Sequence, residues 1–330
     1  MIASPETLET ESEATLATTE SKTAKPIQDA VDEYLYLIGR PTLKQFLRFV
    51  RREAVEPDDE ATLIKEWQAA KEHVRKLEKE EAGHADNPVI NPIDVHGKYE
   101  PLLVEFLKDP LVQNGFNTVP TEVAFVELNT LVVYQHHIDL TFVRQLKQKL
   151  GPAPSDEDIF RTCLPYDHPH PPAKWRRVDA QTFVFLSPSN DMRFLGHMNL
   201  QSENLKDYPP PGALVGAVGL AVGFGSNFLN AIRAEGRLIL NNGSHRAYAL
   251  REMGFTHVPC IVQHVSTRDE LDVVAASAIR RDPNHFLKGK RPSMLRDYFN
   301  PKLRKVLPVH RKLKQITVKY DVSETDIPAF

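Results

Sequence analysis

The most regular alternation of apolar and polar positions lies between residues 237 and 262. Residues 237–240 and 258–262 are short apolar runs that predict buried strands. Between them, residues 241–243 read Asn-Asn-Gly, which favours a turn because Asn and Gly tolerate positive φ. Ser244 is a good N-cap, helix-favouring residues follow it, and Gly254 stands where a left-handed C-terminal cap belongs. The pattern therefore predicts strand, turn, helix, turn and strand.

Similar patterns place elements elsewhere in the chain. A strand begins near Val123, and an amphipathic helix capped by Asp139 ends at Leu150. Further strands are expected over residues 182–186 and, as a core strand, 213–222. Helices are expected over residues 99–108, 228–232 and 269–280.

Residues 27–83 follow a helical pattern throughout. Asp58 or Asp59 can cap a helix that carries an apolar stripe at spacings of four and three, formed by Leu63, Trp67, Ala70, Val74 and Leu77. Such a stripe most simply packs on neighbouring elements of the same chain. A dimer seam is the alternative, although the pattern is short for a coiled coil.

Proline interrupts the chain between residues 151 and 212, which hold ten prolines. Long helices cannot run through this segment, so it is interpreted as an insertion that could cover a cleft. The glycine-containing loop at residues 223–227 follows it. This loop could approach a phosphate closely, but it lacks a known phosphate-binding fingerprint and turn geometry explains it more simply.

The polar residues at the start of the helix after residue 243 are the leading candidate site. Free backbone N–H groups and the helix dipole attract anions there, phosphate above all. The guanidinium of Arg246 suits bidentate phosphate contacts, and His245 could donate to a phosphate oxygen or act as a general acid or base. An ordinary capped helix with exposed His and Arg side chains is the alternative.

The motif Gly243-Ser244-His245-Arg246 resembles the Gly-x-x-Arg box that opens a helix in the ParB/sulfiredoxin-like superfamily. The continuation Ala-Leu-Arg-Glu-Met-Gly and then Val-Pro is also similar to that family. Residues 123–150 provide a second match, with a strand, a polar segment and an amphipathic helix. The resemblance covers about residues 119–265 and implies an α/β (α+β) fold with a mixed sheet and helices.

The resemblance divides the chain into four parts. Residues 1–27 are expected to be a disordered acidic tail, since they are rich in Ser, Thr and Glu and poor in large apolar groups. Residues 28–118 are the expected helical region, and 119–265 the ParB/sulfiredoxin-like domain with its proline-rich insertion. Residues 266–330 form a basic C-terminal extension.

The resemblance also implies chemistry. Sulfiredoxins use a cysteine where this chain has Ser244, and the chromosome-partitioning branch adds a helix-turn-helix pattern that is not evident here. The remaining branch of the superfamily, which contains kinases and NTPases, therefore fits best. It implies that a nucleoside triphosphate with Mg²⁺ binds at the box and that a phosphoryl group is transferred or hydrolysed. The implied phosphate-binding residues are Asn242, Gly243, Ser244, His245 and Arg246, and the implied catalytic residues are His245 and His136.

His136 belongs to the segment Gln135-His136-His137, where the free-serine-kinase branch of the superfamily carries an acidic residue. This departure puts kinase activity in doubt. His136 could still act as a base in place of the carboxylate.

Charge is uneven along the chain. The formal net charge is −3, yet residues 280–319 contain thirteen Lys or Arg and two acidic residues. A DNA-associated or regulatory binding protein is therefore the alternative function. Its predicted contacts are Lys288, Lys290, Arg291, Arg304, Lys305, Arg311 and Lys312, with Lys174, Arg176, Arg177, Lys302 and Lys314 as further candidates. Because nearby aromatics are limited to Phe286, Tyr298 and Phe299, base stacking is not predicted. A surface that balances an acidic face explains the charge equally well.

A third possibility is a metal-dependent enzyme that uses His168 and His170 in the proline-rich insertion. The two cysteines argue against a disulfide scaffold, and Cys260 is expected to be a buried small hydrophobe. Neither a signal peptide nor a membrane span is evident, so no membrane partner and a cytoplasmic location are expected.

Overall fold

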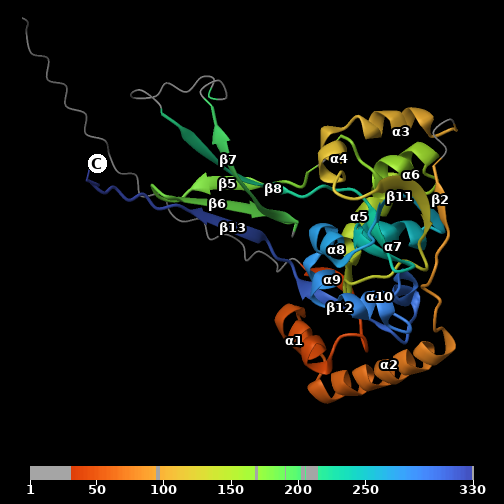
Figure 1. Cartoon of the computed structure of the whole chain (residues 1–330). Helices are drawn as coiled ribbons and strands as arrows, with labels where there is room; N and C mark the ends of the chain where they lie inside the picture. The colour runs from red at the N-terminus through yellow and green to blue at the C-terminus, as the bar shows by residue number, and fades with distance from the viewer. Residues whose placement is uncertain are drawn as a thin grey trace, which may run out of the picture. The chain divides into compact units, whose positions relative to one another are not determined.

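The computed structural model describes residues 31–93, 97–167, 170–189, 191–201, 205 and 215–328, all within the unit Val31–Phe330. The predicted acidic tail and His168 lie outside these residues. Helices and β-sheets are both present, as the predicted α/β class requires (Figure 1).

The largest sheet has five strands in the order β10-β9-β11-β3-β2. These strands are β2 (Ile90–Pro92), β3 (Thr121–Glu127), β9 (Asn230–Ala234), β10 (Arg237–Asn242) and β11 (His257–His264). β9 and β11 are parallel, and the other pairs are antiparallel, so the sheet is mixed. The strands predicted from residues 123, 237–240 and 258–262 are therefore confirmed.

The helix expected over residues 228–232 is wrong, because this segment leads into β9. The consecutive residues Asn230, Ala231 and Ile232 are all buried. This is expected because β9 has a neighbouring strand on each side and packs against the protein with both of its faces. A short run of buried residues has no periodicity that separates a strand from a helix.

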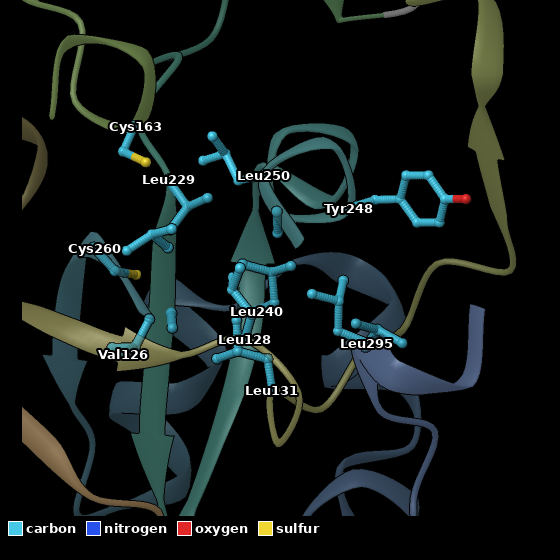
Figure 2. Packing of buried hydrophobic residues seen from close by; sticks show 14 of the residues in the cluster. Val126, Leu128, Leu131, Cys163, Leu229, Leu240, Tyr248, Leu250, Cys260 and Leu295 are labelled. Carbon is cyan, nitrogen blue, oxygen red and sulfur yellow. The ribbon is translucent and has the colours of Figure 1, made fainter. Parts of the chain in front are cut away.

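The core lies around this sheet. Figure 2 shows Leu128, Leu131 and Leu240 packed together, and all three are fully buried. Cys163 and Cys260 are also buried and free, which confirms the expectation for Cys260. Each buried leucine contributes roughly 1.5–3 kcal/mol through removal of its side chain from water.

A second sheet has the order β12-β1-β4. It is formed by β1 (Val31–Leu37), β4 (His137–Asp139) and β12 (Arg304–His310). The helical prediction for residues 27–83 is thus wrong over β1. It holds for α1 (Leu43–Glu53) and α2 (Glu60–Glu80).

The cap and stripe of α2 agree with the sequence pattern. The side chain of Asp59 accepts the N–H of Thr62, and Leu63, Ala70 and Val74 are buried within the same chain. The apolar stripe is therefore used for intramolecular packing.

The helices around the larger sheet begin with α3 (Glu100–Leu107), which confirms the predicted helix at 99–108, and α4 (Pro110–Gly115). They continue with α5 (Leu140–Leu150), α6 (Asp156–Cys163) and α7 (Ser244–Glu252). Asp139 caps α5 as predicted, since its side chain accepts the N–H of Phe142.

The predicted proline-rich insertion contains strands. β5 (Lys174–Arg177) and β6 (Thr182–Ser187) form a three-stranded sheet with β13 (Lys314–Lys319), in the order β13-β6-β5 (Figure 1). β7 (Met192–Leu200) and β8 (Ala217–Phe224) form a separate pair. The strand at 182–186 is confirmed. The described part of the strand expected at 213–222 is not a core strand, because β8 pairs only with β7 and alternates exposed and partly buried residues.

The helix expected over residues 269–280 is broken into α8 (Arg268–Val274) and α9 (Ser277–Arg281). The break lies where the backbone N–H of Ala276 donates to the side chain of Asn241. α10 (Pro283–Lys288) and a short 3-10 helix, η2 (Leu295–Phe299), follow. Within the described chain, every helix is too short or too polar to cross a bilayer.

Candidate functional site

The helix α7 begins at a glycine in a left-handed conformation. Gly243 has φ 96° and ψ 24° and is the N-cap, so the prediction that Ser244 caps the helix is wrong; Ser244 is its first residue. As a glycine, the N-cap has no side chain that could cap the first turn. A Cβ at position 243 would lie 3.2 Å from Leu229 Cδ1 and 3.3 Å from Arg246 Nη2. Only glycine fits this tight, left-handed position.

Asn241 fixes the strand end just before this turn. Its side chain donates to the side chain of Asn230 at 3.0 Å and to the carbonyl of Val274 at 3.1 Å, and accepts the N–H of Ala276 at 2.8 Å. The hydroxyl of Tyr134 donates to the Asn241 carbonyl. Sequence reasoning treated Asn241 only as a turn residue, because the contacts that show its structural role come from distant segments.

The glycine-containing loop and the Gly-Ser-His-Arg box are brought together. Asn242 Nδ2 donates to the carbonyl of Ser226 at 2.9 Å. Arg246 Nη1 donates to the carbonyl of Asn227 at 2.6 Å. The loop at residues 223–227, which was only a weak candidate from the sequence, therefore borders the start of α7.

Arg246 is directed into the protein. It is 6% exposed, and its Nη1 also donates to the carbonyls of Thr162 and Cys163 at 3.1 and 3.2 Å, at the end of α6. These carbonyls lack partners within their own helix, so Arg246 ties α6 to α7. Nε and Nη2 donate to none of the residues that the structure describes.

Among the described residues, the positive charge of Arg246 has no salt-bridge partner, and the carboxylate of Asp191 acts on it only through its charge. Burial lowers its pKa, while electrostatic interactions with the Cys163 and Cys260 thiol groups and with the Asp191 carboxylate act in the opposite direction. No described carboxylate forms a salt bridge with it. Because the guanidinium remains protonated in proteins, a buried cation lies next to the positive end of the α7 dipole. The surroundings of Arg246 therefore favour an anion.

The histidines of the candidate site are neutral near pH 7. His245 lies edge-on to Phe142 at 5.7 Å between ring centroids, and burial lowers its pKa to about 3. The charge of His137 contributes to that lowering. His137 stacks on Tyr34 at 4.9 Å, and burial lowers its own pKa to about 4. His136, rather than His137, was the catalytic residue predicted from the sequence. Burial lowers the pKa of His136 as well.

Most of the predicted nucleic-acid contacts are paired with acidic side chains. Five of the seven form salt bridges: Lys288 with Glu235, Arg291 with Glu81 and Asp297, Lys305 with Asp58 and Glu66, Arg311 with Asp32, and Lys312 with Glu53. The surface that balances an acidic face thus accounts for these cations. In the described chain Lys290 and Arg304 form no such pair. A nucleic-acid role for the seven stays a prediction.

Of the two predicted metal ligands, only His170 lies among the described residues. His170 Nδ1 lies 3.1 Å from the carbonyl of Pro171, and the ring stacks on Phe224 at 5.9 Å between centroids. No group of three His, Cys, Asp or Glu with metal-binding geometry occurs in the part of the chain that the structure covers.

Comparisons with protein-family models, with curated proteins and with solved structures find no match for this chain.

Proposed function

We propose that this protein binds a nucleoside triphosphate through its phosphates at the start of α7 and transfers or hydrolyses a phosphoryl group. The observation that carries the proposal is the arrangement around Arg246. Its Nη1 donates to carbonyls of α6 and of the loop at residues 223–227. Nε and Nη2 donate to none of the described residues, and no described carboxylate forms a salt bridge with the guanidinium.

Electrostatics favours an anion at this position. Leaving a charge buried without a counter-ion costs several kcal/mol, and a bound phosphate would offset that cost. The first-turn N–H groups of α7, uncapped by any side chain, would add donors to the same anion. The role assigned to Arg246 is thus double: it positions the loop with one nitrogen and faces the phosphate with the others.

The sequence resemblance supports a nucleotide as the source of the phosphate. The box Gly243-Ser244-His245-Arg246 is similar to the ParB/sulfiredoxin-like motif, and branches of that superfamily bind nucleotides. Mg²⁺ is usually held by phosphate oxygens, water and one or two carboxylates, so it needs no cage of protein ligands. Asp191 is the carboxylate whose charge reaches Arg246.

A neutral imidazole is suited to accept a proton from an attacking hydroxyl or water. We assign this role to His245, with His136 as the second candidate. His245 lies next to the proposed phosphate site in sequence. Burial lowers its pKa and weakens it as a base, and the negative charge of a bound phosphate would raise that pKa again.

A calorimetric screen of ATP, ADP, CTP and GTP with Mg²⁺ tests the proposal. We expect one nucleotide to bind the wild-type protein and phosphate to be released or transferred. Arg246→Met should abolish binding, and Arg246→Lys should weaken it because a lysine lacks the planar fork. Arg251→Met, at the other end of α7, is the matched control and should leave the affinity unchanged. Equal affinity of wild type and Arg246→Met would refute the phosphate site.

Binding and chemistry are separated by one further variant. His245→Gln should retain nucleotide affinity within a few-fold and lose phosphate release. If His245→Gln kept both nucleotide affinity and phosphate release, His245 would have no role in the mechanism. His136→Gln would then be tested in the same way.

A further inference from the structure

The sheet β13-β6-β5 places an aromatic row on one face. Trp175 is opposite Phe185, and Arg177 is opposite Phe183. Because directly opposed residues of antiparallel strands lie on the same face, and residues two apart do so too, these four side chains share a face. Tyr320, just after β13, extends the row by stacking on Phe183.

The rings are close and in part open to solvent. The centroid of Trp175 lies 6.1 Å from that of Phe185, with 23° between the planes, and 6.3 Å from that of Phe183. Phe183 and Tyr320 are stacked with centroids 6.5 Å apart. Trp175 is 67% exposed and Tyr320 41% exposed, although an aromatic ring of this size usually finds cover in a soluble protein.

The same sheet is strongly basic. Its three strands contain five cations and no acidic residue: Lys174, Arg176, Arg177, Lys314 and Lys319. All five are exposed, and none forms a salt bridge within the described residues. Arg177 and Lys314 share the aromatic face at its opposite ends, while Lys174 and Arg176 lie on the other face of the edge strand β5.

We propose that this sheet binds single-stranded nucleic acid. Bases stack on the row of Trp175, Phe185 and Phe183, and Arg177 and Lys314 on the same face hold the phosphates that connect them. Proteins that bind single strands combine a positive surface with aromatic rings, because every base has a face that can stack. A duplex buries its bases and offers only its phosphates, so it fits this surface less well.

The cations Lys174, Arg176, Arg177 and Lys314 of this sheet were further candidates from the sequence, but its aromatic residues differ from those considered in the C-terminal extension. Of the aromatics there, Phe286 and Tyr298 are buried, and Phe299 stacks on Tyr248 at 4.7 Å. The aromatic residues available for stacking come instead from β5 and β6, more than a hundred residues earlier in the chain. The sheet brings them beside the cations of β13, and the inference does not depend on nucleotide binding at α7.

Fluorescence anisotropy of a labelled twelve-residue oligothymidine tests the inference. We expect the full chain to bind it more tightly than a duplex of equal length or polyglutamate, which has charge complementarity but no bases. Trp175→Leu should weaken binding about tenfold, since it keeps an apolar side chain and removes the stacking ring. Trp175→Phe should recover most of the affinity, which separates stacking from a change in folding.

Charge is tested with paired and unpaired cations. Replacing Arg177 and Lys314, the two cations on the aromatic face, by Gln should reduce the slope of log affinity against log salt by about 0.7 for each lost phosphate contact. The matched control, Gln at the salt-bridged Arg311 and Lys312, should leave the slope unchanged.

Three results would overturn the inference. One is equal or tighter binding of the duplex or polyglutamate. Another is wild-type affinity in Trp175→Leu, and the third is no detectable binding of the oligonucleotide at low salt.

Discussion

Two buried arginines in this molecule meet opposite surroundings. Arg291 is 3% exposed and donates to the carboxylates of Asp297 and Glu81. Arg246 is 6% exposed, and its hydrogen-bond acceptors within the described chain are three carbonyl oxygens. Burial opposes the charge on both. For Arg291, hydrogen bonds and charge from Asp297 and Glu81 outweigh that effect and raise its pKa, whereas the pKa of Arg246 is lowered.

The difference shows how a charged residue's role depends on its partners. The charge of Arg291 is balanced within the fold by the carboxylates of Asp297 and Glu81. Few of its donors and little of its charge are therefore available to a polyanion. The charge of Arg246 is not balanced in this way, because the carbonyl groups that accept its hydrogen bonds carry no net negative charge. We therefore interpret Arg291 as structural and Arg246 as both structural and ligand-binding.

The largest effect is expected at Arg291. Arg291→Met leaves Asp297 buried at 1% exposure without its main partner, which should lower the free energy of unfolding by about 3–5 kcal/mol. Urea unfolding measures this. Lys290→Met, at the exposed neighbour, is the control and should change stability by less than about 0.5 kcal/mol. If Arg291→Met lowered the free energy of unfolding by less than about 1 kcal/mol, the proposed difference between the two arginines would be contradicted.

A smaller loss of stability is expected at Arg246. Arg246→Met removes hydrogen bonds to three carbonyls but leaves no carboxylate unpaired, so the free energy of unfolding should fall by about 1–3 kcal/mol. A ligand at one hundred times its dissociation constant should stabilise the wild type by about 2.7 kcal/mol and the variant not at all. Equal stabilisation of both proteins would place the ligand elsewhere.

Gly243 comes next. Gly243→Ala puts a Cβ 3.2 Å from Leu229 Cδ1 at φ 96°, and the left-handed backbone alone costs roughly 1–2 kcal/mol. Gly254→Ala is a matched control: its φ is 97°, but nothing lies within 4 Å of the added Cβ. Thermal unfolding should rank Gly243→Ala below Gly254→Ala. The reverse order would mean that close packing at the start of α7 is unimportant.

The last effect is the pH dependence contributed by the histidines. Burial lowers the pKa of His245 to about 3 and that of His137 to about 4, against about 6.5 in the unfolded chain. Between these values the unfolded state binds more protons, so their contribution to stability is present above pH 6.5 and is lost as the pH falls towards 4.

Urea unfolding between pH 7 and pH 5 should therefore show a decline that is shallower in His245→Gln. An identical decline in wild type and variant would indicate that His245 is not buried in neutral form.

Local chemistry was sufficient to predict part of the fold. The strands β10 and β11, the cap at Asp139 and the left-handed Gly254 follow from residues close together in sequence. β1 was missed because it is completed by β4 and β12, which lie about a hundred and 270 residues further along. No window around residues 31–37 contains those partners.

The candidate site shows the same limit. The sequence identifies the box at residues 243–246 and its charge, but not that Arg246 Nη1 is occupied by carbonyls of α6 and of the loop before β9. It counts the cations of residues 280–319 correctly without showing which have acidic partners. Pairing depends on side chains that only the folded chain brings together.

The most direct test of the account observes Arg246 itself. The Nε–H signal of Arg246 can be followed by NMR in nitrogen-15-labelled protein and assigned by its absence in Arg246→Lys. Addition of inorganic pyrophosphate should shift this signal and leave that of Arg291 in place, because of these two arginines it is Arg246 that has donors without described acceptors and no described salt bridge. An unmoved Arg246 signal at saturating pyrophosphate, or equal shifts at both arginines, would contradict an anion site at the start of α7.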